Sequence, residues 1–538
     1  MVFTSLRYWN GWNFFICFIV SLGQIAFGYP ASIIGVTLAQ PSFLIFMGLL
    51  DATQDPPALA ANADQLIGAM SGVFQAGAAI NVFLAGWVAD KYGRKWGFHY
   101  CGLLSVLGGA MLCGARNSTM FIAARLFAGA GSWGYLAISL RGLMVGMNGV
   151  NIALGYSLAT YMGLAFYFVN DPSTQWRGPL GISLIFPFMM FVVTMIVPES
   201  PRFLLMSGKI DEAREVIFRL HSIKGDPGQE FARSEFYQMS KQAELDRTLE
   251  PSWLEMFRRS SYRKRAIMAM SVAFIGQSTG VLVLNNYGPT IYAALGYDTV
   301  HQLIFQCGWV SIAIFGNLVG ALIMDRTGRK PLLIGGVLGA SICLAIEAAM
   351  VSCFAEQGSN KAGLGMGVAA AYLFVTIYSI VDVAGVVYFS ELFPNHIRAK
   401  GVALAIGTYA VTDLVYLEVA ATAFRNIGWR FFLVFIILGS LGTIFMWFYL
   451  VETKNIPLEE MAKLFGDEVA VYEADVHVDH NTHELVLEER NGNHIARVAT
   501  EVGIPRHATT LTDIETGNLD AGKPTAGNEQ LEHVKEER

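Results

Sequence analysis

Long apolar runs are the feature that most limits what this chain can fold into. A continuous run of about 18 or more mostly apolar residues is long enough to cross a bilayer as a helix. Only 15% of the 538 residues are charged, whereas a soluble protein carries about a quarter. We therefore predict an all-α membrane protein with twelve transmembrane helices. The predicted spans cover approximately residues 13–36, 66–89, 97–115, 119–140, 143–168, 178–197, 266–292, 302–324, 331–354, 364–390, 401–424 and 430–450.

The distribution of lysine and arginine predicts the orientation of these spans. The loop at residues 41–65 contains neither, whereas segments 91–95, 199–265 and 326–330 are rich in both. Positively charged loops stay on the cytosolic side, so we expect these three segments and both termini in the cytosol and the protein in the plasma membrane. The other side then carries Asn117-Ser-Thr, which matches the acceptor pattern for N-glycosylation.

The end of the chain differs in composition from the rest. From Gly466 onward it carries 16 Asp/Glu against 6 Lys/Arg and no apolar periodicity, which is typical of disorder. The predicted parts are a cytosolic N-terminus (1–12), a first six-helix bundle (13–197), a cytosolic loop with short helices (198–265), a second six-helix bundle (266–451) and an acidic, largely disordered cytosolic tail (452–538).

The two predicted bundles carry matching marks in the same order, which indicates a duplication. A hinge of acidic and then basic residues, Gly86–Lys95, recurs as Gly320–Lys330 with its aspartate 235 residues later (325 − 90). Glu199 and Glu452 end the sixth and twelfth spans, with an offset of 253 residues (452 − 199). Two duplicated bundles place a substrate path between them, near the middle of the bilayer.

Five motifs together resemble the sugar porter family of the major facilitator superfamily, and its fungal branch most. They are Gly86–Lys95, Asp325–Lys330, Pro198–Arg202, Ser390–Gly401 and Glu452–Lys454. The resemblance covers about residues 13–465. It implies a secondary transporter that alternates between outward-open and inward-open states.

Acids and bases gather at the hinges and at the ends of spans six, ten and twelve. A charge network of this kind can hold the transporter closed toward the cytosol and must break before it opens inward. Alternatively, the basic residues only anchor the spans by the positive-inside rule. The predicted gate residues are Asp90, Arg94, Glu199, Arg202, Asp325, Arg329, Glu391, Arg398 and Glu452.

The repeat is incomplete at the end of span four. In the second half, span ten runs into the acidic segment Ser390–Pro394 and then Arg398; in the first half, Gly134–Leu140 runs directly into Arg141. The hinge aspartate precedes the arginine by 73 residues (398 − 325) in the second half and by 51 (141 − 90) in the first. We infer that about fifteen residues are absent, which shortens span four and removes the acid expected to pair with the first hinge.

The resemblance implies sugar contacts that this chain has largely lost. The family's glutamine of span five falls on Gly149, its asparagine of span seven on Leu282, its tryptophan of span ten on Val386 and its coupling aspartate of span one on Pro30. The polar side chains that do lie at membrane depth either bind a solute or tie helices together. Our candidates for solute binding are Gln277, Asn285, Asn286 and Asn317.

Four acids lie in predicted spans of the second bundle, and among them we single out Asp382 and Asp413 in spans ten and eleven; the other two are Glu347 and Glu418. A charge in lipid is costly, so an intramembrane acid suggests a function. We take both as candidates for proton coupling, with a neutral or paired structural acid as the alternative.

Little in the sequence favours an enzyme. Gly129–Gly134 matches a dinucleotide-binding pattern, but it lies inside an apolar span with no preceding strand, so helix packing explains it better. We predict no metal, no cofactor and no nucleic-acid partner. We expect a monomer that moves a sugar or a similar small polar solute, by facilitated diffusion or with protons. The alternatives are transport of another organic solute, such as an organic acid or secondary metabolite, and a non-transporting nutrient sensor.

Overall fold

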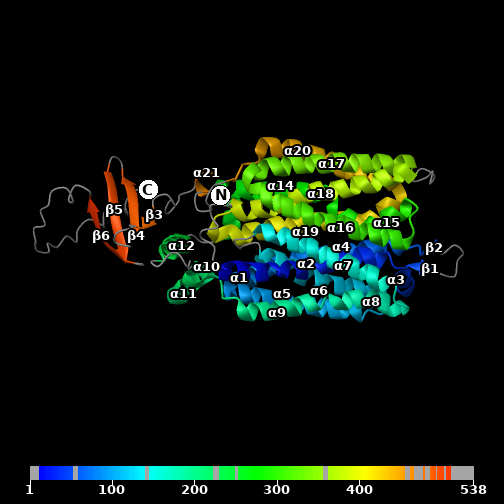
Figure 1. The fold of residues 1–538 in the computed structure, drawn as a ribbon, viewed down its shortest axis with the longest axis horizontal. Coiled ribbons are helices and arrows are strands. Elements are labelled where there is room, and N and C mark those ends of the chain that lie inside the picture. Colours follow the sequence, from blue (N-terminus) through cyan, green and yellow to red (C-terminus); the bar gives the residue numbers. More distant parts are fainter. Residues whose placement is uncertain are drawn as a thin grey trace, which may run out of the picture.

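The computed structural model is mostly helical and describes most of the chain. The described residues are 11–51, 58–139, 145–221, 229–248, 252–354, 361–454, 461–465, 476–478, 485–491, 494–501 and 504–510. The predicted N-terminal segment 1–12 and the end of the tail lie largely outside them. In Figure 1 the early helices form the lower half of the membrane part and the late helices form the upper half.

The first bundle holds the spans before residue 198. Its helices are α1 (Gly11–Ser21), α2 (Gly23–Leu38), α4 (Ala63–Tyr92), α5 (Arg94–Cys113), α6 (Ser118–Ser139), α7 (Val145–Tyr167), α8 (Pro172–Ile182) and α9 (Ile185–Ile196). A short helix α3 (Pro41–Phe46) and the two-residue strands β1 (Leu50–Asp51) and β2 (Ala58–Leu59) follow α2.

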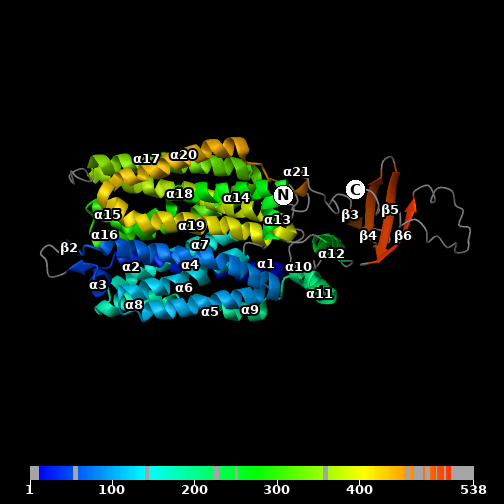
Figure 2. The same cartoon turned by 180° about the vertical axis from the view of Figure 1, so that it is seen from behind.

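The second bundle repeats this order. Its helices are α14 (Ser260–Gln277), α15 (Val281–Ala294), α16 (Thr299–Thr327), α17 (Arg329–Phe354), α18 (Lys361–Leu392), α19 (Asn395–Ile427), the 3-10 helix η2 (Gly428–Phe431) and α20 (Phe432–Tyr449). The two bundles meet where α4 packs on α19, α7 on α16 and α2 on α15. Figure 2 shows the same two layers from behind.

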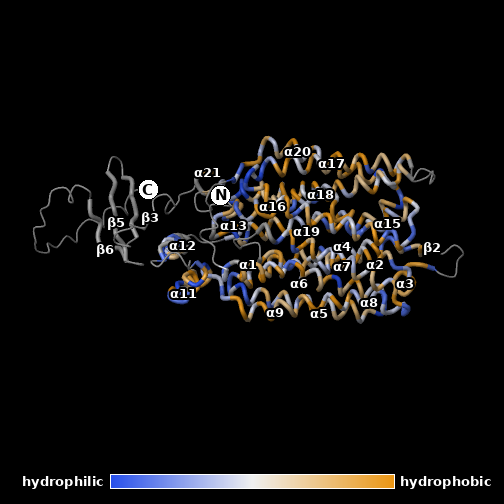
Figure 3. Tube along the Cα trace, viewed as in Figure 1, coloured by the Kyte–Doolittle hydropathy of each residue, from blue (hydrophilic) through white to orange (hydrophobic). Residues whose placement is uncertain are grey.

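Ten stretches of the described residues are helical, apolar and long enough to cross a membrane. In Figure 3 apolar residues dominate these helices, and polar residues gather at the ends near α10 to α13. The helices around the hinges run beyond the predicted spans: α4 ends at Tyr92 and α5 begins at Arg94. Hydropathy alone could not predict these additional helical turns, because their residues are polar and lie beyond the ends of the apolar runs.

Both hinges make the same turn, through a glycine. Gly93 has φ 103° between α4 and α5, and Gly328 has φ 97° between α16 and α17. Only glycine adopts such a backbone without strain. The turn therefore fixes how each pair of helices meets. We call the end of the spans that carries both glycines the hinge end and the opposite end the far end.

The helices after the first hinge are shorter than their counterparts. α6 has 22 residues and α18 has 32, while α7 has 23 and α19 has 33. The hinge helices α4 and α16, in contrast, have 30 and 29 residues. α5 has 20 residues and its counterpart α17 has 26, so each described helix from α5 to α7 is shorter than its counterpart; residues 140–144, between α6 and α7, lie outside the described residues.

The loop between the bundles and the tail contain short elements. The loop forms α10 (Pro201–Met206), α11 (Ile210–His221), α12 (Glu230–Thr248) and α13 (Trp253–Arg258); the tail forms α21 (Met461–Leu464) and the strands β3 (Val476–Val478), β4 (Leu485–Asn491), β5 (His494–Glu501) and β6 (Ile504–Thr510).

The four tail strands pair in sequence order as an antiparallel sheet, which differs from the disorder that the composition predicts. β4 and β5 pair up to Asn491 opposite His494. The two residues between them in the sequence are Gly-Asn, a combination typical of two-residue hairpins.

The glycines of Gly129–Gly134 lie in helix contacts, as their position in an apolar span predicts. A Cβ atom on Gly129 would overlap the carbonyl oxygen of Phe74 on α4. A Cβ atom on Gly131 or on Gly134 would overlap α5, at Ser105 and Cys101. Small residues of this kind let membrane helices approach closely.

Gly129→Ala should therefore destabilise the protein by about 1–3 kcal/mol, the usual cost of overpacking. The measurement is the apparent melting temperature of the purified protein in detergent. Gly335→Ala is the matched control, because a Cβ atom on Gly335 of α17 meets nothing within 4 Å. Equal melting temperatures for the two variants would contradict this packing role.

Candidate functional site

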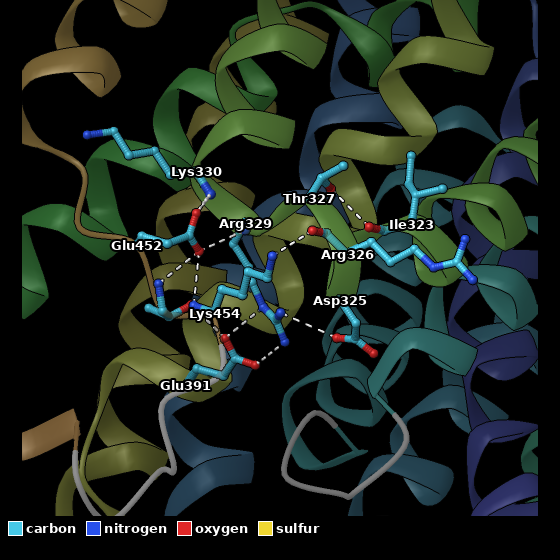
Figure 4. A network of polar contacts seen from close by, with 10 residues as sticks. Ile323, Asp325, Arg326, Thr327, Arg329, Lys330, Glu391, Glu452 and Lys454 are labelled. Carbon is cyan, nitrogen blue, oxygen red and sulfur yellow. Dashed lines mark hydrogen bonds and ion pairs between the residues drawn. The ribbon is translucent and has the colours of Figure 1, made fainter. Parts of the chain in front are cut away.

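The second hinge is held by a network of charged groups from three parts of the bundle. We call Asp325, Arg329, Glu391, Glu452 and Thr453 the second hinge network. The backbone N–H groups of Arg329 and Lys330 donate to the Glu452 carboxylate at 2.9 and 3.1 Å. The Arg329 guanidinium donates to both oxygens of Glu391 at 3.0 and 2.7 Å. Figure 4 shows Arg329 between these acids.

Two further contacts complete the second hinge network. The Thr453 hydroxyl donates to Glu391 at 2.7 Å, and Arg329 pairs with Asp325 at 3.3 Å. Arg329 is 8% exposed, so loss of an acid would leave a buried cation without a full set of partners. The turn at Gly328 makes the geometry possible, since it points the first amides of α17 at Glu452.

The first hinge repeats half of this arrangement. We call Arg94, Lys95, Glu199 and Ser200 the first hinge network. The Glu199 carboxylate accepts from the backbone N–H groups of Arg94 at 3.1 Å, Lys95 at 3.3 Å and Ser200 at 2.9 Å. The position of Glu199 relative to α5 thus matches that of Glu452 relative to α17.

The other predicted gate residues lie around these two networks. Arg398 is buried and its Nε donates to the Phe393 carbonyl at 3.1 Å, across the turn between α18 and α19. Asp90 lies in the last turn of α4 beside the first hinge, and Lys400 near the start of α19 lies within electrostatic range of it. Arg202 is the second residue of the short helix α10, three residues after Glu199.

Of the predicted solute ligands, Asn285 joins the two bundles. Its side-chain oxygen accepts from the Ser32 hydroxyl of α2 at 3.2 Å, and its backbone carbonyl accepts from Gln306 at 3.0 Å. A Cβ atom on Gly35 would lie 2.9 Å from the Asn285 carbonyl oxygen. Asn285 is therefore packed inside the contact between α2 and α15 in this conformation.

The other three predicted ligands present open acceptors near the interface. Gln277 donates to the Tyr378 hydroxyl at 3.4 Å, and Asn317 donates to its own helix at Ala313. The side-chain oxygens of Gln277, Asn286 and Asn317 are buried without a hydrogen-bond partner among the described residues. A buried acceptor of this kind is costly unless water or a solute satisfies it.

Gly149 lets α7 approach Asn317 closely. A Cβ atom there would lie 2.7 Å from the Asn317 side-chain oxygen. The absence of a side chain on α7 therefore lets the two bundles pack together at this polar group. The sequence suggests that Gly149 replaces a glutamine that contacts sugar in the family. In the structure this position faces Asn317, a polar residue on α16 of the other bundle.

Asp382 and Asp413 lie close to the same interface. They are within electrostatic range of each other, and Tyr156 of α7, Tyr378 and Tyr409 are within range of both. Asp413 is 1% exposed, and one of its carboxyl oxygens has no hydrogen-bond partner among the described residues. The site thus combines two acids of the second bundle with a tyrosine of the first.

Sequence reasoning missed two charged residues. Arg125 of α6 is 1% exposed and donates to the carbonyls of Met70 at 2.9 Å and Pro30 at 3.1 Å. Arg425 of α19 pairs with Asp64 of α4 at 2.5 Å, at the far end between the bundles. Arg125 was visible as a cation inside an apolar run, but no signal in the sequence could pair Arg425 with Asp64.

Asn117 is exposed and lies at the far end, where its side chain accepts from the Met120 N–H at 2.8 Å. None of the described residues form a cluster of three or more His, Cys, Asp or Glu side chains suited to a metal ion.

These features, two similar helical bundles with a polar interface and a charged hinge end, define a secondary membrane transporter. Residues 16–465 match the family model for sugar (and other) transporters, so the chain belongs to that family, within the major facilitator superfamily. It is a multi-pass membrane protein that transports a sugar or sugar-like solute.

Curated relatives span nearly the whole chain. The MFS-type transporter criB of Aspergillus cristatus is 27% identical, with 88% of this chain and 98% of the relative covered. The hexose transporter HXT10 of Saccharomyces cerevisiae is 26% identical over 86% and 87%. A probable quinate permease of Neosartorya fischeri is 26% identical over 99% and 97%.

A solved structure shares the fold. The proton:xylose symporter XylE bound to 6-bromo-6-deoxy-D-glucose superposes with a TM-score of 0.71 at 19% identity, covering 84% of this chain and 99% of that chain.

Glu391→Gln tests the second hinge network. The substitution keeps the shape of the side chain but leaves Arg329 without its bidentate acid, so we expect transport to fall about tenfold or more, as charge-assisted hydrogen bonds contribute about 1.5–3 kcal/mol. The measurement is the initial rate of labelled solute uptake, corrected for the amount of protein at the membrane. Glu244→Gln is the control, since Glu244 forms an exposed ion pair with Lys241. Wild-type rates in Glu391→Gln would refute the role of this network.

Proposed function

We propose that the chain carries a small polyhydroxylated solute across the plasma membrane by alternating access, with both termini in the cytosol. The observation that supports this most is the set of unsatisfied acceptors on Gln277, Asn286 and Asn317. Asn286 lies next to Gly35 of α2 and Asn317 next to Gly149 of α7, at the interface of the two bundles. Hydroxyl groups of a solute are donors that suit such acceptors. The route between the bundles is where a duplicated transporter binds its solute.

The proposal includes twelve spans. Ten stretches qualify by length and composition. One of them, Ile397–Tyr449, has 53 residues and contains both α19 and α20; at 1.5 Å per residue it is about twice as long as a bilayer requires. Counting it as two spans and adding α7, which has 23 residues, gives twelve (10 + 1 + 1).

The proposed cytosolic location of the hinge end rests on charge. The basic segments after the spans lie at this end, which supports a cytosolic location by the positive-inside rule. The spacing from the hinge aspartate to the next motif arginine, 51 residues in the first half (141 − 90) and 73 in the second (398 − 325), supports a span four that lost its cytosolic end. Asn117, exposed at the far end, then becomes the proposed glycosylation acceptor.

Within this scheme the hinge networks act as the gate. The acids and bases named at the two hinges hold the hinge end closed while the far end opens. The second network is complete in its described contacts, with Glu391 as its central acid. The first has Glu199 in the same role as Glu452, and the segment that would supply its second acid is the one we propose to be absent.

Proton coupling is assigned to Asp413, with Asp382 as its neighbour. Both lie in the membrane part of the second bundle, next to Tyr156 of the first. A carboxyl at this depth is neutral when protonated and costly when charged, so its proton can be exchanged only when a water path reaches it. Coupling follows because the path is open to one side at a time.

A non-sugar solute such as an organic acid is the second candidate. It is favoured by the positions at which the family's sugar contacts are replaced, Gly149, Leu282 and Val386, and by the relative named as a probable quinate permease, 26% identical. A sensor that does not transport remains the outcome if no uptake is found.

Uptake in a cell that lacks its own transporters should separate these candidates. We expect saturable uptake of at least one labelled hexose, because the open acceptors suit hydroxyl donors. Quinate uptake without hexose uptake would establish the second candidate instead. Absence of saturable uptake of hexoses, disaccharides and quinate by protein that reaches the plasma membrane would contradict transport altogether.

Asp413→Asn should abolish accumulation driven by a pH gradient while exchange of labelled for unlabelled solute persists, because the amide cannot carry a proton. Proteoliposomes with an imposed pH gradient measure both. Glu347→Gln is the matched control: Glu347 is also buried, but it lies on α17, which packs on α16, α18 and α20 within the second bundle. Unchanged accumulation in Asp413→Asn would remove this residue from coupling.

A further inference from the structure

A groove runs along α19 where that helix meets the first bundle. It has a volume of about 470 Å³ and is lined by Phe83 of α4, Phe274 of α14 and residues of α19 between Leu404 and Tyr416. In Figure 2 α4 and α19 lie next to each other, one from each bundle. We call this hollow the interface groove, because its walls come from both bundles.

The interface groove faces the bilayer. Its lining residues Val411 and Val415 are 51% and 56% exposed. Both lie near the middle of α19, which runs from Asn395 to Ile427, and apolar side chains exposed at that depth contact lipid tails. A ligand of the interface groove therefore comes from the bilayer and not from water.

The walls of the interface groove are mostly apolar, and their hydroxyl groups are already hydrogen-bonded. Thr408 and Thr412 donate to carbonyls of their own helix, at Leu404 and Thr408, over 2.9 and 2.7 Å. The Tyr416 hydroxyl bonds to that of Ser278 at 2.9 Å. The part of the ligand that fills the interface groove is therefore apolar.

The volume of the interface groove sets the size of this apolar part. A cavity of about 150 Å³ holds one benzene molecule, so a hollow three times as large suits on the order of 18 carbon atoms. One long hydrocarbon chain has this size.

A carboxylate lies beyond Val415, toward the far end. Glu418 follows Val411 by seven residues (418 − 411), which is two helical turns, so both lie on the same face of α19. Glu418 is exposed. A Cβ atom on Gly72 of α4 would lie 2.5 Å from its Oε2 atom, so the carboxylate lies between α4 and α19, in line with the interface groove.

The surroundings of Glu418 supply no cation. Arg425, two turns further along α19, pairs with Asp64. Tyr287 of α15 is within electrostatic range, but its hydroxyl donates to the Leu417 carbonyl at 3.0 Å. None of the described residues donates a hydrogen bond to the Glu418 carboxylate or forms an ion pair with it. A carboxylate at membrane depth is costly without such a partner, so the place favours a cationic group.

We propose that the interface groove binds a single-chain lipid amine, with the hydrocarbon chain along α19 and the ammonium group on Glu418. The ammonium has three N–H donors and opposes the charge of the carboxylate. A ligand held between α4 and α19 also opposes the movement of one bundle past the other, so it slows transport from outside the solute path. This effect rests on the proposed transport function, whereas binding does not.

Binding is tested with tritiated octadecylamine on the full-length protein in phosphatidylcholine nanodiscs at neutral pH. Empty nanodiscs give the part that only dissolves in lipid. We expect saturable binding to the protein, and about tenfold or more weaker competition by octadecanol, which has the same chain without the charge. Binding no greater than that of empty nanodiscs, or equal competition by octadecanol, would overturn the proposal.

Two variants locate the site. Glu418→Gln removes the charge and Val411→Phe fills the middle of the interface groove, so each should weaken octadecylamine binding about tenfold or more. The melting temperature of each variant shows that it is folded. Wild-type affinity in both folded variants would place the amine elsewhere.

Each variant has a matched control. Glu244→Gln makes the same exchange in α12, in the loop between the bundles. Val434→Phe makes the same exchange on α20, where Val434 is 38% exposed and does not line the interface groove. Both controls should bind octadecylamine as wild type does, and a tenfold loss in either would contradict the assignment to the interface groove.

Transport is measured separately in proteoliposomes. We expect octadecylamine, but not octadecanol, to lower the maximal rate of solute uptake at least severalfold in wild type and not in Glu418→Gln. Binding with an unchanged uptake rate would refute the effect on transport. Solute uptake without octadecylamine binding would refute this inference alone, whereas octadecylamine binding without any solute uptake would refute the proposed transport function alone.

Discussion

The arrangement of each bundle depends on one carboxylate that closes the first turn of the helix after the hinge. Glu452 accepts the N–H groups of Arg329 and Lys330, and Glu199 accepts those of Arg94 and Lys95. The first amides of a helix have no partner within the helix, and they attract an anion. The contact therefore fastens the last span of each bundle to the third and makes six spans one body.

Contacts between the bundles are of two kinds. They include the neutral hydrogen bonds Ser32–Asn285 and Tyr161–Ser311 and the ion pair Asp64–Arg425 at the far end. Hydrogen bonds between membrane helices contribute about 0.6 kcal/mol on average, whereas those to charged groups contribute about 1.5–3 kcal/mol. The neutral contacts at the interface therefore cost less to break than the charged contacts at the hinges and at the far end.

Much of the fold could be predicted, because a lipid environment restricts which residues a membrane span can contain. A span must be apolar and long, and a sharp turn between two spans needs glycine, so the helices, Gly93 and Gly328 follow from local pattern. Glu452 was predicted from the repeat and Glu391 from the family motif Ser390–Gly401, and the structure places both on Arg329. The strands of the tail were not predicted, since acidic composition outweighed the one hairpin signal, Gly-Asn at 492–493.

The sequence by itself determined the membrane class and the family, and it predicted the duplication and the shortfall after span four, because each depends on residue type and spacing along the chain. Only the tertiary structure decided which polar groups meet. It placed Asn285 in a contact between bundles and Asn317 opposite Gly149. The physical reason is that a buried donor, acceptor or void is defined by what packs against it, and those neighbours lie on other helices, far away in sequence.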